Sequence, residues 1–280
     1  MKVYKTIDSI RKDIRKAKRE GKAIGFVPTM GYLHEGHLSL IRKAREESDL
    51  CVVSIFVNPI QFGPKEDLKK YPRNLDRDLE LCKLNKVDIV FTPDTKEMYK
   101  DNARAFIEIE GLTENLCGAK RPGHFRGVAT VVAKLFNIVK PDTAYFGQKD
   151  AQQAAVVKKL TEDLDIDTKI KVMPIVRETD GLAMSSRNAY LRPIDRKKAT
   201  LIYQSLMSAQ SLYKKGERDS KNIIKQMKEL LLKEKNIRID YISIVNGESL
   251  VDIPRVQRGA LVAVAVRIGK TRLIDNIVLK

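Results

Sequence analysis

Short apolar runs alternate with helical patterns through the first two-thirds of this chain, and this alternation is what most constrains its fold. The strand-like runs are residues 23–27, 50–57, 87–91, 143–146 and 170–176. The helical patterns between them are residues 37–47, 73–84, 127–139 and 151–160. Strands that are apolar on both faces need cover on both faces, and parallel strands need a crossover between them. The pattern predicts an α/β fold with a Rossmann-like parallel sheet and helices on both faces.

After about residue 178 the pattern changes. Two long helical patterns, 195–215 and 219–235, precede three strand-like runs at 239–245, 260–268 and 272–278. Helices followed by consecutive strands indicate an α+β arrangement. We therefore expect two domains, a Rossmann-like one at residues 1–178 and a smaller α+β C-terminal one at residues 179–280.

The charge of the chain admits two interpretations. Lys and Arg number 53 against 36 Asp and Glu, a formal net charge of +17, and a basic excess is typical of proteins that bind nucleic acid. Here, however, basic and acidic residues are interleaved along the expected helices, as on solvated, ion-paired faces. Aromatic residues make up only 6%, and no RNA-binding motif is visible. We expect no nucleic-acid partner, with an RNA-binding protein on a synthetase-like fold as one alternative.

Other features of the sequence indicate the cellular compartment of the protein. No apolar run approaches the ~20 residues that span a bilayer, and residues 1–6 carry no apolar signal-peptide region. The cysteines, Cys51, Cys82 and Cys117, are odd in number and widely spaced, which fits a reducing compartment. We expect a cytoplasmic protein with no membrane partner.

The strongest motif is IGFVPTMGYLHEGH at residues 24–37. An apolar strand enters a tight loop that ends in His-x-Gly-His at the start of a helix. Backbone N–H groups, the positive end of the helix dipole and the imidazoles of His34 and His37 would meet there, which suits a polyphosphate. A metal ligated by these histidines is not expected, because His124 is distant and no zinc spacing is present. The simpler alternative is a pair of helix-start histidines that the backbone satisfies.

Three further clusters carry polar groups. Asn58 and Gln61 follow the second strand, where their amides could bind hydroxyl or carboxylate groups, or could merely decorate an Asn-Pro turn. The segment YFGQKD at 145–150 brings a lysine and an acid to a helix start, although a capping turn would look the same. The segment MSSRN at 184–188 could close over a triphosphate. The basic run at 120–127 is a weaker candidate for contact with phosphates or a carboxylate.

These motifs, in this order, resemble the pantothenate synthetases, the AMP-forming pantoate–β-alanine ligases of the nucleotidyl-transferring α/β superfamily. The matching stretches are residues 28–37, 56–62, 121–127, 146–150 and 184–188. The resemblance implies ATP-dependent condensation of (R)-pantoate with β-alanine to pantothenate through a pantoyl adenylate, with release of pyrophosphate and AMP. It also implies Mg²⁺, a homodimer, nucleotide and pantoate binding in the first domain, and a lid formed by the second. Another nucleotidyltransferase of the superfamily is the remaining alternative.

The resemblance also implies roles for individual residues. The expected catalytic groups are His37, His34 and Lys149. The residues expected to bind ATP are Met30, Gly31, Tyr32, Leu33, His34, Glu35, Gly36, His37, Gly147, Gln148, Lys149, Asp150, Val176, Met184, Ser185, Ser186 and Arg187. The residues expected to bind pantoate and β-alanine are Gln61, Gln153, Asn58, Pro28 and Met30.

Overall fold

A computed structural model describes residues 1–64 and 66–280, and the chain divides into two compact units. The first unit consists of Met1–Ile109, Arg121–Gly147 and Gln153–Pro174. The second unit consists of Glu110–Lys120, Gln148–Gln152 and Ile175–Lys280. The backbone therefore passes from one unit to the other several times.

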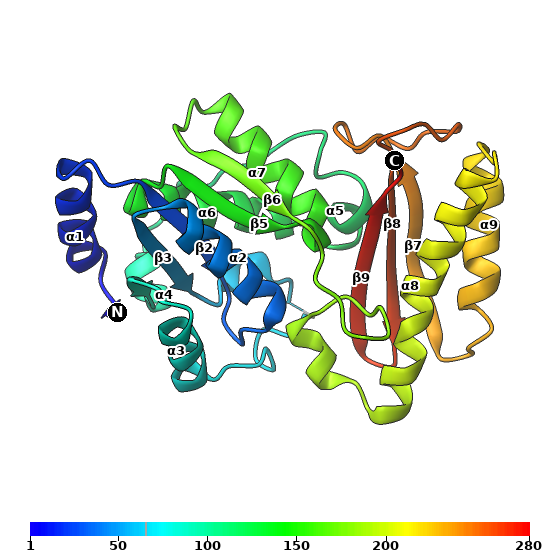
Figure 1. Cartoon of the computed structure of the whole chain (residues 1–280), viewed down its shortest axis with the longest axis horizontal. Coiled ribbons are helices and arrows are strands. Elements are labelled where there is room, and N and C mark those ends of the chain that lie inside the picture. Colours follow the sequence, from blue (N-terminus) through cyan, green and yellow to red (C-terminus); the bar gives the residue numbers. More distant parts are fainter. Residues whose placement is uncertain (65) are drawn as a thin grey trace. The chain divides into compact units, whose positions relative to one another are not determined.

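The first unit is built on a six-stranded sheet in the order β1-β4-β3-β2-β5-β6, of which Figure 1 labels β2, β3, β5 and β6. Its strands are β1 (Lys2–Tyr4), β2 (Ile24–Thr29), β3 (Leu50–Ile55), β4 (Ile89–Phe91), β5 (Thr143–Gly147) and β6 (Lys169–Met173). Every neighbouring pair is parallel, which confirms the sheet expected from the apolar runs. The strand order reverses between β2 and β5, and ligands of such sheets bind outside the carboxyl ends of the strands at that point.

Helices cover both faces of this sheet. The helices of this part of the chain are α1 (Ile7–Arg19), α2 (Glu35–Glu47), α3 (Leu75–Leu84), α4 (Thr95–Met98), α6 (His124–Val139) and α7 (Ala151–Asp163). Neighbouring side chains of β2 point to opposite faces. Val27 belongs to the same apolar cluster as Leu40 and Ile41 of α2, whereas Phe26 meets the ring of Phe136 of α6 edge-on. The expected covering on both faces is confirmed.

The second unit has an α+β arrangement, as its sequence pattern predicts. It contains α5 (Leu116–Lys120), α8 (Pro193–Lys214), α9 (Ser220–Leu231) and an antiparallel sheet of β7 (Ile237–Val245), β8 (Leu261–Ile268) and β9 (Thr271–Val278). Buried side chains of α8 and α9, such as Leu206 and Met227, share a core with Val262 and Val264 of β8. None of the helices in the described residues is long and apolar enough to cross a membrane.

Three short 3₁₀ turns carry expected site residues. They are η1 (Pro59–Gln61), η2 (Gln148–Asp150) and η3 (Ser186–Tyr190). The sequence pattern assigned neither a helix nor a strand to these three places, and it extended two strands too far. β3 ends at Ile55 rather than at residue 57, and β6 ends at Met173, directly before Pro174, which has no N–H to donate to a sheet.

Glu47, at the end of α2, fastens this helix to the sheet and gives the first unit a predictable response to acid. It accepts hydrogen bonds of 2.7 Å from Lys171 Nζ and from Tyr145 Oη. These bonds hold the pKa of Glu47 at about 2, below its usual 4.5. A carboxyl whose pKa is lower in the folded state stabilises the fold above its unfolded pKa. The stabilisation is lost as the pH falls from about 4.5 through about 2.

We therefore expect Glu47→Gln to lower Tm at pH 7 and to make Tm depend less on pH. The gap in Tm between wild type and variant should narrow as the pH falls toward 2, as calorimetry over that range would measure. Glu46→Gln is the matched control, because Glu46 pairs with Lys43 on the surface of the same helix. A gap that stays constant with pH would contradict the role of Glu47.

Candidate active site

The loop between β2 and α2 has a strained backbone held by a buried carboxylate. Gly31 and Tyr32 have φ values of 81° and 52°, and a non-glycine residue rarely adopts this region. Asp78 of α3 accepts 2.7 Å hydrogen bonds from the N–H groups of both Tyr32 and Leu33. Burial raises the pKa of Asp78, although these two N–H groups and Arg77 act in the opposite direction. Asp78 therefore fixes the loop that leads to the two histidines.

Asp78→Asn should loosen this loop. An amide offers one oxygen where the carboxylate offers two, so its NH₂ would face one of the two backbone N–H groups. A buried donor left without an acceptor costs about 1–3 kcal/mol. We expect a loss of that size in the free energy of unfolding, measured by urea denaturation, together with a loss of catalytic activity. Asp76→Asn makes the same charge change at an exposed position of α3 and should change neither quantity.

His34 and His37 cap the start of α2 reciprocally. His34 is the N-cap residue, and its Nδ1 accepts from the N–H of Gly36 at 3.2 Å. The N–H of His34 in turn donates to Nδ1 of His37 at 3.3 Å, and the two ring centroids lie 4.1 Å apart. Because each Nδ1 accepts, each ring carries its proton on Nε2, as assigned from these hydrogen bonds.

This tautomer reconciles the two interpretations of the motif. The backbone satisfies Nδ1 of both rings, as the simpler interpretation holds. The other nitrogen of each ring is an N–H donor beside the positive end of a helix of 13 residues. The capping contacts thus fix the orientation of both rings.

Asn58 and Gln61 are buried at the end of β3, with 1% and 6% of their surfaces exposed. Nε2 of Gln61 lies 2.9 Å from Sδ of Met30. This contact links η1 to the loop that follows β2. Pro28 lies in β2 and is half-buried.

The basic run before α6 holds this region together. Arg121 forms a two-pronged ion pair with Glu66, at 2.6 Å from Nε and 2.7 Å from Nη2. Burial alone would raise the pKa of Glu66, but Arg121, the N–H of Gly63 and His124 together outweigh it, and the net shift is downward. Nδ1 of His124 lies 2.9 Å from the carbonyl oxygen of Gln61. These contacts give Arg121 and His124 a structural role in supporting the loop of Gln61.

In the second unit, Asn276 of β9 holds the turn that carries Lys149. Its Nδ2 donates to the carbonyl oxygens of Gln148 and Lys149, both at 3.0 Å. Its Oδ1 accepts from Nε2 of Gln148, also at 3.0 Å. The side chain of Lys149 is 20% exposed and lies 3.8 Å from Asp150. Two of these three hydrogen bonds fix the backbone of the turn at the expected catalytic lysine, and the third holds the side chain of Gln148.

The segment that carries Met184–Arg187 is fastened to the same strand. Arg177 forms a two-pronged ion pair with Asp275 of β9, at 2.6 and 3.0 Å, and its guanidinium also donates to the carbonyl oxygen of Gly181. Ser185 is the N-cap residue of η3 and accepts from the N–H of Arg187 at 3.2 Å. The Met184 N–H donates to the carbonyl oxygen of Val176 at 3.0 Å, so two expected ATP residues are paired through their backbones.

Two neighbouring glutamines of α7 differ in role. Gln152 is buried and bonds to backbone groups, accepting from the N–H of Cys117 and donating to the carbonyl oxygens of Leu112 and Asn115. Gln153, which the sequence predicts to bind substrate, is half-buried and belongs to the first unit. Gln152 is therefore a structural residue.

The expected site residues divide between the two units. Those in the first unit are Pro28, Met30, Gly31, Tyr32, Leu33, His34, Glu35, Gly36, His37, Asn58, Gln61, Gly147 and Gln153. Those in the second unit are Gln148, Lys149, Asp150, Val176, Met184, Ser185, Ser186 and Arg187. Sequence reasoning missed the residues that position them, namely Asp78, Arg177, Asp275 and Asn276. No local signal identifies these four, because each acts on a segment distant in the sequence or in another element.

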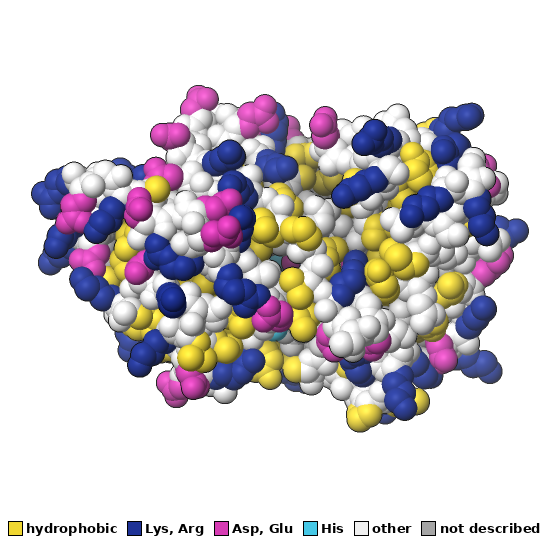
Figure 2. Space-filling model, viewed as in Figure 1, with side chains coloured by type: hydrophobic (Ala, Val, Ile, Leu, Met, Phe, Trp, Pro, Cys, Tyr) yellow, Lys and Arg dark blue, Asp and Glu magenta, His cyan; other side chains and the backbone are white. Residues whose placement is uncertain are grey.

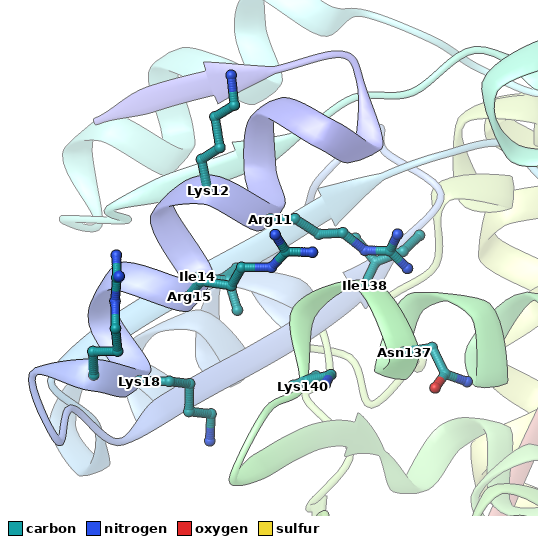
Figure 3. A pocket seen from close by; sticks show the side chains of 9 residues that line it. Arg11, Lys12, Ile14, Arg15, Lys18, Asn137, Ile138 and Lys140 are labelled. Atoms are coloured by element: carbon teal, nitrogen blue, oxygen red, sulfur yellow. The ribbon is translucent and has the colours of Figure 1, made fainter.

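A separate groove of about 950 Å³ lies between α1 and the end of α6 (Figure 3). Its lining is Arg11, Lys12, Ile14, Arg15, Lys18, Arg19, Asn137, Ile138 and Lys140. It contains none of the expected ATP or pantoate residues. On the face seen in Figure 2, acidic side chains lie among the basic ones, in agreement with the interleaved charges of the sequence. The described residues contain no cluster of three or more His, Cys, Asp or Glu suited to a metal ion.

Comparisons with known proteins cover the whole chain. Residues 2–278 match the family model described as pantoate-beta-alanine ligase. Pantothenate synthetases of Acetivibrio thermocellus and Caldicellulosiruptor saccharolyticus are each 54% identical over 280 residues, which is 100% of both chains in each case.

Solved structures give the same result. The crystal structure of pantothenate synthetase from Thermus thermophilus has a TM-score of 0.95 and 44% identity, with 99% of each chain covered. A pantoate-beta-alanine ligase from Francisella tularensis, complexed with beta-gamma ATP and beta-alanine, has a TM-score of 0.82 and 36% identity. The match covers 99% of this chain and 97% of the Francisella chain.

Proposed function

Because this chain belongs to the pantoate–β-alanine ligase family and condenses pantoate with β-alanine to pantothenate, we propose that it does so through a pantoyl adenylate. In the first half-step, a carboxylate oxygen of pantoate attacks the α-phosphorus of ATP and pyrophosphate leaves. In the second, the amine of β-alanine attacks the acyl carbon, and AMP leaves as the amide bond forms. Family membership favours this ligase over both alternatives, another nucleotidyltransferase and an RNA-binding protein.

The reciprocal histidine cap is the observation that carries the proposal for the first half-step. A carboxylate with a pKa near ~4 is already ionised at neutral pH, so no general base is required. The barrier is electrostatic, since an anion approaches a polyanion and charge grows on the departing pyrophosphate. Preorganised donors such as the Nε2–H groups of His34 and His37 stabilise such charge without reorganising.

Lys149 and the η3 segment are proposed to complete this stabilisation. Lys149 supplies a point charge, and Asn276 holds the backbone of this lysine in place. Ser185, Ser186 and Arg187 supply hydroxyl, backbone and guanidinium donors to the phosphates. We assign adenosine to the backbone near Val176 and to the turn from Gly147 to Asp150.

Pantoate is assigned to the polar groups of the first unit. Gln61 and Gln153 would bind its hydroxyl and carboxylate oxygens, with Pro28 and Met30 forming the wall, whereas the amide of Asn58 is engaged by Gln61 and other protein groups and would act through Gln61. Gln61 is suited to this task because its amide is buried and lies against Met30. Neutral amides bind a carboxylate without neutralising the charge that must attack phosphorus.

Mg²⁺ is proposed to arrive bound to ATP. Mg²⁺ in such sites is held mainly by substrate phosphates and water, with one or two protein carboxylates. Among the expected ATP residues, Glu35 hydrogen-bonds to Arg42, whereas the contact of Asp150 with Lys149 is long, at 3.8 Å, and its side chain is 49% exposed, so Asp150 fits this requirement better. The ion would offset charge on the triphosphate.

The remaining expectations are also kept as proposals. We assign nucleotide and pantoate binding to residues 1–178 and the lid to residues 179–280. We further propose a cytoplasmic homodimer, on the basis of the family resemblance.

The proposal is tested with purified protein, ATP, Mg²⁺ and pantoate. Without β-alanine, labelled pyrophosphate should exchange into ATP only when pantoate is present, which reports a reversible adenylate. Adding β-alanine should then yield pantothenate and AMP. Pantothenate formation without any pantoate-dependent exchange or detectable adenylate would argue against the two-step route.

A further inference from the structure

A chain of hydrogen bonds links Tyr99 to the buried amide of Gln61. Tyr99 Oη lies 2.9 Å from Oδ1 of Asn58, and Nδ2 of Asn58 lies 3.0 Å from Oε1 of Gln61. Tyr99 follows α4 and belongs to none of the motifs that the sequence analysis identified. All three residues belong to the first unit.

The carbonyl oxygen of Gly127 sets the direction of this chain. It lies 3.1 Å from Nδ2 of Asn58, and a carbonyl oxygen can only accept. The nitrogen of the Asn58 amide must therefore face Gly127, and its oxygen must face Tyr99. The Tyr99 hydroxyl is then obliged to donate, and burial favours this by raising its pKa. The second N–H of Asn58 donates to Gln61.

Close backbone packing keeps the Gly127 carbonyl in place. A Cβ atom at Gly127 would lie 2.5 Å from the carbonyl oxygen of Ile60 and 2.6 Å from Cα of Gln61. The first turns of α6 thus lie directly against η1, and only glycine permits this approach. The fixed carbonyl is a rigid reference for both amides.

These bonds decide which group of the Gln61 amide faces the proposed pantoate site. Its oxygen is occupied by Asn58, so its NH₂ group points toward Met30. The acceptor there is a thioether sulfur at 2.9 Å, which is a weak partner for an N–H. A substrate oxygen would be a stronger acceptor. If the Gln61 amide were turned by about 180°, its oxygen would face the carboxylate of the substrate and repel it.

We propose that Tyr99 is a positioning residue that acts through Asn58 to hold the Gln61 amide with its N–H toward an oxygen of pantoate. This inference rests on the proposed binding of pantoate at Gln61. It requires no contact between Tyr99 and the substrate. It predicts that the site selects a ligand with an acceptor oxygen at this position.

Tyr99→Phe removes the hydroxyl and keeps the ring that packs beside Phe56. We expect the KM for pantoate to rise about tenfold, because a hydrogen bond to a charged ligand is worth about that much or more. The kcat and the KM for ATP should change little. Tyr145→Phe is the matched control, since it removes another buried hydroxyl bond of the first unit, to Glu47, and should leave the KM for pantoate unchanged.

A double-mutant cycle distinguishes positioning from a general structural effect. If Tyr99 acts through Gln61, Tyr99→Phe should have no further effect on the KM for pantoate in a Gln61→Ala background. An undiminished tenfold effect in that background, or no effect of Tyr99→Phe alone, would overturn the inference. If Gln61→Ala itself left the KM for pantoate unchanged, the assignment of pantoate to Gln61 would fail instead.

Discussion

His37→Ala should reduce pantoate-dependent ATP–pyrophosphate exchange by about 10²–10³-fold, the range found when one preorganised donor to a developing charge is removed. The Nε2–H of His37 stands at the positive end of α2, where charge on the departing pyrophosphate would accumulate. The loss should fall mainly on kcat, because the donor is proposed to act on the transition state more than on bound ATP.

The alanine variant also loses a helix cap, so a second variant is needed. His37 Nδ1 accepts the N–H of His34, and Glu at this position of a helix makes the same reciprocal bond through a carboxylate oxygen while offering no N–H donor. His37→Glu should therefore recover most of the roughly 1 kcal/mol that the cap contributes, while exchange stays low. If His37→Glu recovered both stability and exchange, the ring donor would have no catalytic role.

Much of the fold follows from local patterns in the sequence. Val27 and Val53 lie in apolar runs whose strands pair in parallel, and such runs are typical of a sheet covered on both faces. The turn to α2 was also predictable, because His-x-Gly-His directly follows a strand and precedes a helical pattern. These features depend on residues that are close in sequence, so a single chain is enough to show them.

The supports of the candidate site were not predictable in the same way. Asp78 bonds to residues 45 and 46 positions earlier, and Asn276 holds a turn 127 and 128 positions earlier. The sequence around an aspartate on a helix, or around an asparagine in a strand, does not indicate these structural roles. Only the packing of distant segments assigns them, and packing is not visible in composition or periodicity.

The structure also shows how two of the basic residues are used. The net charge of +17 includes Arg121 and Arg177, which are committed to ion pairs with Glu66 and Asp275. These arginines build the framework around the candidate site. Of the basic residues expected to bind ATP, Lys149 is the one proposed to be catalytic.

Lys149→Ala should lower the rate of adenylate formation by about 10²-fold, comparable to the loss of one preorganised donor to phosphate charge. Unlike His37, Lys149 carries a full positive charge, so its contribution is a long-range attraction as well as a hydrogen bond. Wild-type exchange should therefore fall with added salt more steeply than exchange by the variant, as rates measured from low to high ionic strength would show.

A conservative variant and a nearby control test whether the effect is due to the charge of Lys149 itself. Lys149→Arg keeps the charge but spreads it over a planar fork, so partial activity is expected if a compact ammonium is required. Lys159→Ala removes an equal charge from α7, where Lys159 pairs with Asp163 on the surface, and should leave exchange unchanged. Because Asn276 holds the backbone of Lys149, the alanine variant should keep η2 in place and unfold at the wild-type temperature. Full exchange activity in a folded Lys149→Ala protein would remove this lysine from the proposed reaction and leave the two histidines as the main source of stabilisation.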